Sequence, residues 1–217
     1  TTLFRSQLGD AALARAGKAQ DKEHQEDVVR TALETWGRLD VLVNNTGINP
    51  VFGGLMDLDD SAATKISEVN LLATLSWTRT AWNLWMKENG GSVVNLASIA
   101  GLRTAPGIAY YGVTKAGLIH LTEELAVELG PTVRVNAVAP GAISTEAVLE
   151  AIASSENPDQ TRQDYEDLHA LRRLGTPREV AQTVYFLGSA EASFLTGTIL
   201  PVDGGMTASF MMAGRPV

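Results

Sequence analysis

Residues 92–130 read SVVNLASIAGLRTAPGIAYYGVTKAGLIHLTEELAVELG and decide the fold. The segment 92–97 is short and apolar, which is typical of a strand buried on both faces of a sheet. It ends at Ser98, and residues 109–129 then form a predicted helix that stops at Gly130. A buried strand, a polar turn and a long helix in this order are one repeating unit of an α/β protein.

The flanking segments repeat this alternation. The sequence predicts helices over residues 23–36, 61–88, 109–129 and 177–189, the last opened by a capping box at 176–179 with proline at its first position. It predicts strands over residues 11–19, 39–43, 92–97, 133–138 and 198–202, with 39–43 buried on both faces. Strands joined by long helices predict a doubly wound, Rossmann-like parallel sheet in a single domain over residues 1–217.

Composition narrows the classes of protein. A chain of 217 residues with 45% hydrophobic residues can build a substantial core. A net charge of −8 argues against nucleic-acid partners, and no apolar stretch is long enough to span a membrane. The absence of cysteine excludes disulfides, and the three dispersed histidines, expected at the surface or an interface, predict no metal site. A cytoplasmic protein is expected.

Polar or glycine-rich residues follow four of the predicted strands. Each group alone fits an ordinary turn equally well. In open parallel sheets, however, ligands bind outside the carboxyl ends of the strands. The four groups are 44–47 (Asn-Asn-Thr-Gly), Ser98, 140–145 (Pro-Gly-Ala-Ile-Ser-Thr) and 203–205 (Asp-Gly-Gly).

Tyr111 and Lys115 are four residues apart on the predicted helix, so their side chains share one face. An ammonium within about 4–6 Å lowers the pKa of an acidic group by roughly 1–3 units. Lys115 is therefore expected to lower the pKa of the Tyr111 phenol, which would act as a general acid or base. Ser98, 13 residues before Tyr111, would hydrogen-bond the oxygen of a carbonyl substrate.

Six motifs occur in the chain order of the short-chain dehydrogenase/reductase family, which the sequence resembles over roughly residues 17–206. They are GRLDVLV before Asn44, the Asn-Asn-Thr-Gly turn, the spacing of Ser98 and Tyr111, Tyr-x-x-x-Lys, Pro-Gly-x-Ile-x-Thr, and GTPREVA at 175–181. The resemblance implies an NAD- or NADP-dependent oxidoreductase that interconverts a carbonyl and a secondary alcohol. A small-molecule carbonyl or alcohol, such as a 3-oxoacyl thioester, would be its substrate.

The resemblance also implies residue roles. Tyr111 would be the catalytic acid and base, Ser98 the substrate-orienting donor, Lys115 the electrostatic partner and a ribose ligand, and Asn70 the holder of a relay water. Cofactor contacts are implied for Asn44, Asn45 and Gly47 on the adenosine and ribose side, for Tyr111 and Lys115, and for Pro140, Gly141, Ile143 and Thr145 on the nicotinamide side.

The glycine-rich turn that binds pyrophosphate in the family does not occur in this sequence. We therefore assign residues 11–19 to the family's third strand and 39–43 to its fourth. The first βαβ unit, roughly 40–50 residues by element count, is expected to be missing from an N-terminally incomplete sequence. An apolar edge on strand 39–43 would follow. The alternative is a non-catalytic short form acting as a structural or partner-binding module.

Two further features concern substrate and assembly. Residues 146–173 predict a helical substrate flap, whose Arg162, Arg172 and Arg173 could meet an anionic substrate but are more often solvated or paired. The helix at 61–88 is apolar around most of its circumference, which predicts burial on more than one side. Together with residues 209–212, interpreted as an interface tail, this predicts a homotetramer.

Overall fold

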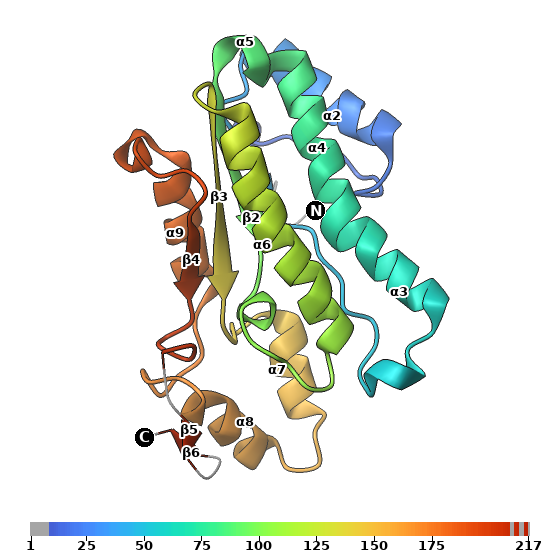
Figure 1. Ribbon diagram of the computed structural model, residues 1–217, viewed down its shortest axis with the longest axis vertical. Helices are drawn as coiled ribbons and strands as arrows, with labels where there is room; N and C mark the ends of the chain where they lie inside the picture. The colour runs from blue at the N-terminus through green and yellow to red at the C-terminus, as the bar shows by residue number, and fades with distance from the viewer. Residues whose placement is uncertain (1–8, 209–210, 213–214, 217) are drawn as a thin grey trace.

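The computed structural model describes residues 9–208, 211–212 and 215–216. Its centre is a four-stranded sheet in the order β1-β2-β3-β4 (Figure 1). All three neighbouring pairs are parallel, so the carboxyl ends of the strands lie at one edge. The predicted doubly wound, Rossmann-like class is confirmed. The strands are β1 Val41–Asn44, β2 Gly91–Leu96, β3 Val133–Pro140 and β4 Ile199–Val202, with a separate antiparallel pair β5 Met211–Met212 and β6 Arg215–Pro216.

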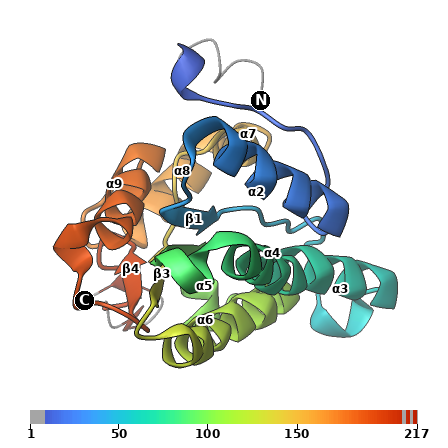
Figure 2. The same cartoon turned by 90° about the horizontal axis from the view of Figure 1, so that it is seen from above.

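Helices cover both faces of this sheet. Helices α4 and α6 lie on one face and α9 on the other, while α2 lies beside the β1 edge (Figure 2). No helix among the described residues is long and apolar enough to cross a membrane. The helices are α2 Lys22–Trp36, α3 Asp60–Ser67, α4 Ala73–Ala81, α5 Lys87–Asn89, α6 Ala109–Leu129, α7 Glu146–Ala153, α8 Pro158–Asp167 and α9 Pro177–Gly188. Short 3-10 turns occur at Gly9–Ala11, Leu55–Asp57, Ile99–Gly101 and Ala190–Ala192.

The long helix predicted at 61–88 is confirmed, with an addition. Helices α3, α4 and α5 form one continuous rod that two π-helical segments interrupt, at Glu68–Leu72 and Trp82–Met86. Such segments insert extra residues into a turn and are frequent at functional sites. The first of them contains Asn70.

Local sequence signals set the other helix ends. The Asp21 carboxylate accepts from the backbone N–H groups of Glu23 and His24 at the start of α2, and Gly37 ends that helix at φ 69°. Thr176 and Glu179 form the predicted capping box of α9. Each device satisfies backbone groups that a helix terminus leaves without an intrahelical partner.

The core lies on both faces of β2 and β3. Val93 and Val135 pack with Leu125 and Leu129 of α6, whereas Val94 and Val138 on the opposite face pack with Leu187. The four valines are 0% exposed. Both central strands are therefore covered by helices on each side, as their apolar sequences predict.

Strand β1 differs from its predicted environment. Val41 is 37% exposed and Val43 is 43% exposed, so the prediction that residues 39–43 are buried on both faces is wrong. The physical reason is the position of β1 at the edge of the sheet, where β2 is its one strand neighbour within the described residues. The expected apolar edge is present.

Residues 11–19 do not form the predicted strand. Apart from a 3-10 turn ending at Ala11, the segment is irregular and mostly exposed. Its last carbonyl, on Ala19, accepts instead from the side chains of Gln25 and Trp77, at 2.8 Å each. An alanine-rich segment has low β-propensity, and a strand needs a partner for its backbone groups. The prediction of a strand at residues 11–19 is therefore wrong.

Candidate active site

The Ser98 turn and the start of α6 meet at the carboxyl edge of the sheet. The Ser98 hydroxyl accepts from the backbone N–H of Ala100 at 3.1 Å and caps the Ile99–Gly101 turn. A Cβ on Gly112 would lie 2.8 Å from the Ala100 carbonyl oxygen, and one on Gly101 would lie 2.6 Å from the Lys115 carbonyl carbon. Glycine at both positions therefore lets the turn press directly on the helix.

This contact brings together the three residues predicted to act on substrate. The Ser98 hydroxyl lies within hydrogen-bonding reach of the Tyr111 phenol. The Lys115 Nζ lies 5.5 Å from the centre of the Tyr111 ring and donates to the Leu96 carbonyl oxygen at 2.6 Å. Because Leu96 ends β2, the sheet itself holds the ammonium beside the phenol.

Burial sets the charge states of this cluster. Burial raises the pKa of Tyr111 above its ordinary 10.0, and the hydrogen bond with Ser98 opposes that shift. Burial also lowers the pKa of Lys115 from 10.5 to about 8. The expected lowering of the Tyr111 pKa by Lys115 is therefore not found, because burial is the largest cause and raises this pKa. A phenol kept neutral at pH 7 is a proton donor.

Asn70 connects this cluster to the turn after β1. Its side chain is 0% exposed and bonds both backbone groups of Ile48, accepting from N at 2.8 Å and donating to O at 2.9 Å. It also donates to the Thr114 hydroxyl at 3.2 Å. Asn70 thus fixes residue 48 against the catalytic helix. Its predicted relay water stays a prediction.

The predicted adenosine-side residues separate into two groups. The Asn44 side chain is buried and donates to the Asn95 side-chain oxygen at 2.9 Å, so it ties β1 to β2. Asn45 and Gly47 are exposed, and Asn45 lines a cavity of about 270 Å³ with Trp77. A Cβ on Gly47 would lie 3.3 Å from the Lys115 Nζ and 3.6 Å from the Asn70 Oδ1.

The predicted nicotinamide-side residues lie in the loop after β3, which pairs with β2. Pro140 ends the strand, and the Gly141 N–H donates to the Val202 carbonyl at 3.1 Å. Ile143 forms a bridge with Gly175, and the Thr145 hydroxyl caps α7. Because β2 and β3 run in register to Leu96 and Val138, this loop and Ser98 leave the sheet at the same edge.

The predicted flap is helical, since α7 and α8 occupy most of residues 146–173 below the strand ends in Figure 1. Its arginines are paired, which confirms the ordinary interpretation. Arg162 lies 3.7 Å from Glu166, Arg172 lies 2.9 Å from Asp167, and Arg173 lies 2.6 Å from Glu179. Residues 209 and 210 of the predicted tail lie outside the described residues.

The sequence alone did not identify three buried polar side chains, which are the hydrogen-bonded pair Asn95 and Thr122 and, separately, His169. Asn95 and Thr122 continue the Asn44 network into α6, with Asn95 donating to the Thr122 hydroxyl at 3.0 Å. His169 is 1% exposed, although the histidines were expected at a surface or interface. Asn95 could have been predicted as a buried polar residue, because it lies within the mostly apolar strand 92–97. No comparable signal marked His169, because its partners are backbone groups, and the Ala142 N–H lies 27 residues away along the chain.

Comparisons with known proteins agree with this geometry. A family model described as enoyl-(acyl carrier protein) reductase matches residues 3–207. Dehydrogenase/reductase SDR family member 4 of Caenorhabditis elegans is 37% identical over 194 residues, which are 89% of this chain and 74% of that protein. The solved structure of ElxO with NADP bound is 32% identical with a TM-score of 0.86, covering 95% of this chain and 85% of that chain. NAD+-bound xylitol dehydrogenase is 27% identical with a TM-score of 0.81, covering 88% and 78%. The chain therefore belongs to the short-chain dehydrogenase/reductase family, whose members are NAD(P)-dependent oxidoreductases.

Proposed function

We propose that this protein reduces the carbonyl of a small molecule, with a 3-oxoacyl thioester as its substrate, at the expense of NADH or NADPH. The observation that carries the proposal is the cluster of the partly buried Ser98 and Tyr111 with the buried Lys115 at the carboxyl edge of the sheet. The acyl-carrier reductase description of the family model supports a thioester substrate. So does the apolar wall beside Tyr111, which includes Val51, Leu55 and Ile108.

The residues present fit a nicotinamide cofactor. The space beside Gly47, which a Cβ would partly fill, opens next to the Lys115 ammonium. Lysine has three donors, and among the described residues the ammonium donates to Leu96 alone, so two donors would remain for a ribose diol. Asn45 and Gly47 would hold the ribose side and residues 140–145 the nicotinamide. When bound, the reduced cofactor supplies a hydride to the carbonyl carbon.

The chain's own residues then handle the oxygen and the proton. Ser98 and Tyr111 donate hydrogen bonds to the carbonyl oxygen and orient it. As the π electron pair of the carbonyl moves to oxygen, the Tyr111 Oη–H bond breaks and its proton forms the alcohol O–H bond. Lys115, cationic below about pH 8, stabilises the phenolate left behind. The raised pKa of Tyr111 keeps its phenol protonated at neutral pH, so the free enzyme carries the proton that reduction consumes.

The assembly proposal rests on exposed apolar side chains. Leu72 and Val113 are each 56% exposed and Val127 is 84% exposed, on the neighbouring rod and on α6. A second copy that covers these residues would form one of the interfaces of the predicted homotetramer. The single domain over residues 1–217 and the cytoplasmic location are parts of the same proposal.

The test is turnover of acetoacetyl thioester, a cyclic ketone and an aldose, each with NADH and NADPH. Substituting Tyr111→Phe removes the transferable proton, and turnover is expected to fall by roughly 10²–10⁴-fold with the fold intact. Trp77 lines the cavity beside Asn45, so quenching of tryptophan fluorescence should report cofactor binding to both proteins.

Retained turnover in the Tyr111→Phe variant would remove the proposed acid. A wild-type protein that shows neither saturable quenching nor turnover would favour the non-catalytic module.

A further inference from the structure

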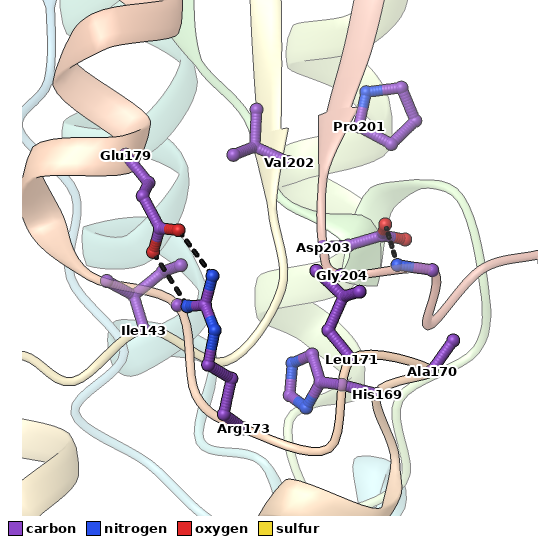
Figure 3. Close-up of a pocket in the computed structure, with 12 residues that line it drawn as sticks. Ile143, His169, Ala170, Leu171, Arg173, Glu179, Pro201, Val202, Asp203 and Gly204 are labelled. Carbon is purple, nitrogen blue, oxygen red and sulfur yellow. Dashed lines mark hydrogen bonds and ion pairs between the residues drawn. The ribbon is translucent and has the colours of Figure 1, made fainter.

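His169 is a buried side chain that takes no part in the proposed reaction steps. It follows α8 at the end of the flap and is 1% exposed. It lines a cavity of about 450 Å³ that lies between the flap, the loop after β3 and the end of β4 (Figure 3). A polar ring enclosed this completely must have partners for both nitrogens.

Both ring nitrogens of His169 have backbone partners. The Nδ1 lies 2.8 Å from the Tyr165 carbonyl oxygen, and the Nε2 lies 3.3 Å from the Ala142 backbone nitrogen. A carbonyl can only accept, so Nδ1 carries the hydrogen and donates it. In the neutral ring Nε2 then holds a lone pair, which accepts from the Ala142 N–H. The tautomer is fixed by geometry.

Ala142 lies at the centre of the predicted nicotinamide-side loop, between Gly141 and Ile143. Its carbonyl accepts from the Gly175 N–H at 3.0 Å, while its N–H is given to His169. Both backbone groups of Ala142 are therefore held, one by His169 within the flap and the other by Gly175 just after it. His169 supplies one of the two bonds.

The ring is also packed against the turn that ends β4. A Cβ on Gly141 would lie 3.2 Å from the His169 Nε2 and 3.0 Å from the Asp203 Cα, and one on Gly204 would lie 3.4 Å from the His169 Cδ2. Figure 3 shows the ring beside this turn, where Asp203 accepts from the Gly205 N–H at 3.0 Å. Gly141 and Gly204 both lie close to the ring, so a shift of the ring toward either glycine would displace the loop or the turn.

We propose that His169 is a positioning residue: by accepting from the Ala142 N–H it holds residues 140–145 in the conformation that binds the nicotinamide half of the cofactor. The inference rests on the proposed function, because it assigns a role in binding that cofactor. It also couples the flap to the cofactor, since the other ring nitrogen is bonded to the Tyr165 carbonyl in α8.

Two substitutions separate the two hydrogen bonds. Asparagine in His169→Asn can place a donor near the position of Nδ1 but reaches no atom to the position of Nε2. Glutamine in His169→Gln can place its oxygen near Nε2 and accept from Ala142. Dissociation constants are measured for NADH or NADPH and for ADP-ribose (2′-phosphorylated where NADPH is preferred), which lacks the nicotinamide. Leu129→Ala, a core change at the far end of α6, controls for lost stability.

The His169→Asn variant should bind the reduced cofactor about 10-fold more weakly, the effect of leaving one buried N–H unpaired. Its affinity for ADP-ribose should stay near that of the wild type. The His169→Gln and Leu129→Ala variants should bind both the reduced cofactor and ADP-ribose about as tightly as the wild type. At saturating cofactor, kcat of His169→Asn should fall less than KM for the cofactor rises.

Unchanged cofactor binding in His169→Asn would overturn the inference, as would equal weakening of both ligands or a glutamine variant as weak as the asparagine variant. Failure of the proposed function appears separately, as a wild-type protein that binds neither reduced cofactor.

Discussion

The two halves of α6 do different work on one continuous helix. The half near Leu125 and Leu129 packs apolar side chains against β2 and β3 and belongs to the main core. The half near Ala109 buries Thr114 and the Lys115 ammonium, and it carries Tyr111 beside Ser98. Burying an ammonium is unfavourable, whereas burying leucine is favourable. The apolar packing around Leu125 and Leu129 therefore holds in place the half of α6 in which the buried Lys115 ammonium opposes folding.

The largest expected effect on stability is in the apolar half. Replacing Leu129 with alanine leaves a cavity beside Val93 and Val135, which should cost about 2–5 kcal/mol of unfolding free energy. Because the substitution is remote from Ser98 and Tyr111, kcat per folded molecule should be unchanged. Chemical denaturation and turnover at low temperature measure the two quantities. A large loss of kcat in fully folded protein would break the division between the halves.

The polar half should respond in the opposite direction. The pKa of Lys115 is lowered from 10.5 to about 8 by burial, so its charged form opposes folding at pH 7. Lys115→Met should raise the unfolding free energy by about 1–3 kcal/mol after loss of the Leu96 hydrogen bond, while lowering turnover by at least about 100-fold. Thermal melts and activity assays measure both effects.

The same group gives a stability change with pH. Between about pH 8 and 10.5 the unfolded chain binds a proton that the native Lys115 has lost, so the wild type should gain stability as pH rises through this window. The methionine variant should lack that gain. Lys87→Met, at an exposed position in α5, is the matched control and should retain it. A melt independent of pH in the wild type would contradict the buried charge.

A smaller loss of stability is expected from substitution of Gly112 in α6, with Gly117 of the same helix as its control. A Cβ on Gly112 would meet the Ala100 carbonyl oxygen at 2.8 Å, a backbone atom that cannot move without the Ser98 turn. Gly112→Ala should therefore cost about 1–3 kcal/mol and reduce turnover. At Gly117 the nearest atom is Leu71 Cδ2 at 3.2 Å, the end of a flexible side chain. Gly117→Ala is the control and should change stability by less than about 1 kcal/mol. Equal effects of both substitutions would count against the turn contact.

Much of the fold was predictable because its signals are local. The apolar runs at 92–97 and 133–138 specify central strands, and the capping box at Thr176 specifies the start of α9. The segment 11–19 was not predictable in this way, because strand formation depends on a partner. The exposed Val41 and Val43 of β1 likewise depend on what lies beside the strand in space.

The site was predictable where spacing along the chain determines proximity. Tyr111 and Lys115 share a helix face, and Ser98 precedes them by one short loop. The net pKa of Tyr111 was not predictable, since the extent of burial is a property of the packed structure. The bonds from Asn70 to Ile48 and from His169 to Ala142 join residues 22 and 27 positions apart, and no local pattern marks them.

The π-helical segment at Glu68–Leu72 has a consequence for engineering this rod. Each extra residue in a helical turn rotates everything after it by about 100° relative to an ideal α-helix. The side chains of α4 are thus rotated about the rod axis relative to where an uninterrupted α-helix continuing from α3 would place them. Chimeras that exchange one part of the rod, or deletions that restore uniform geometry, would turn either Asn70 away from Ile48 or Thr78 away from Asn44. The number of residues between positions 60 and 81 therefore sets how the two ends of this rod face their neighbours.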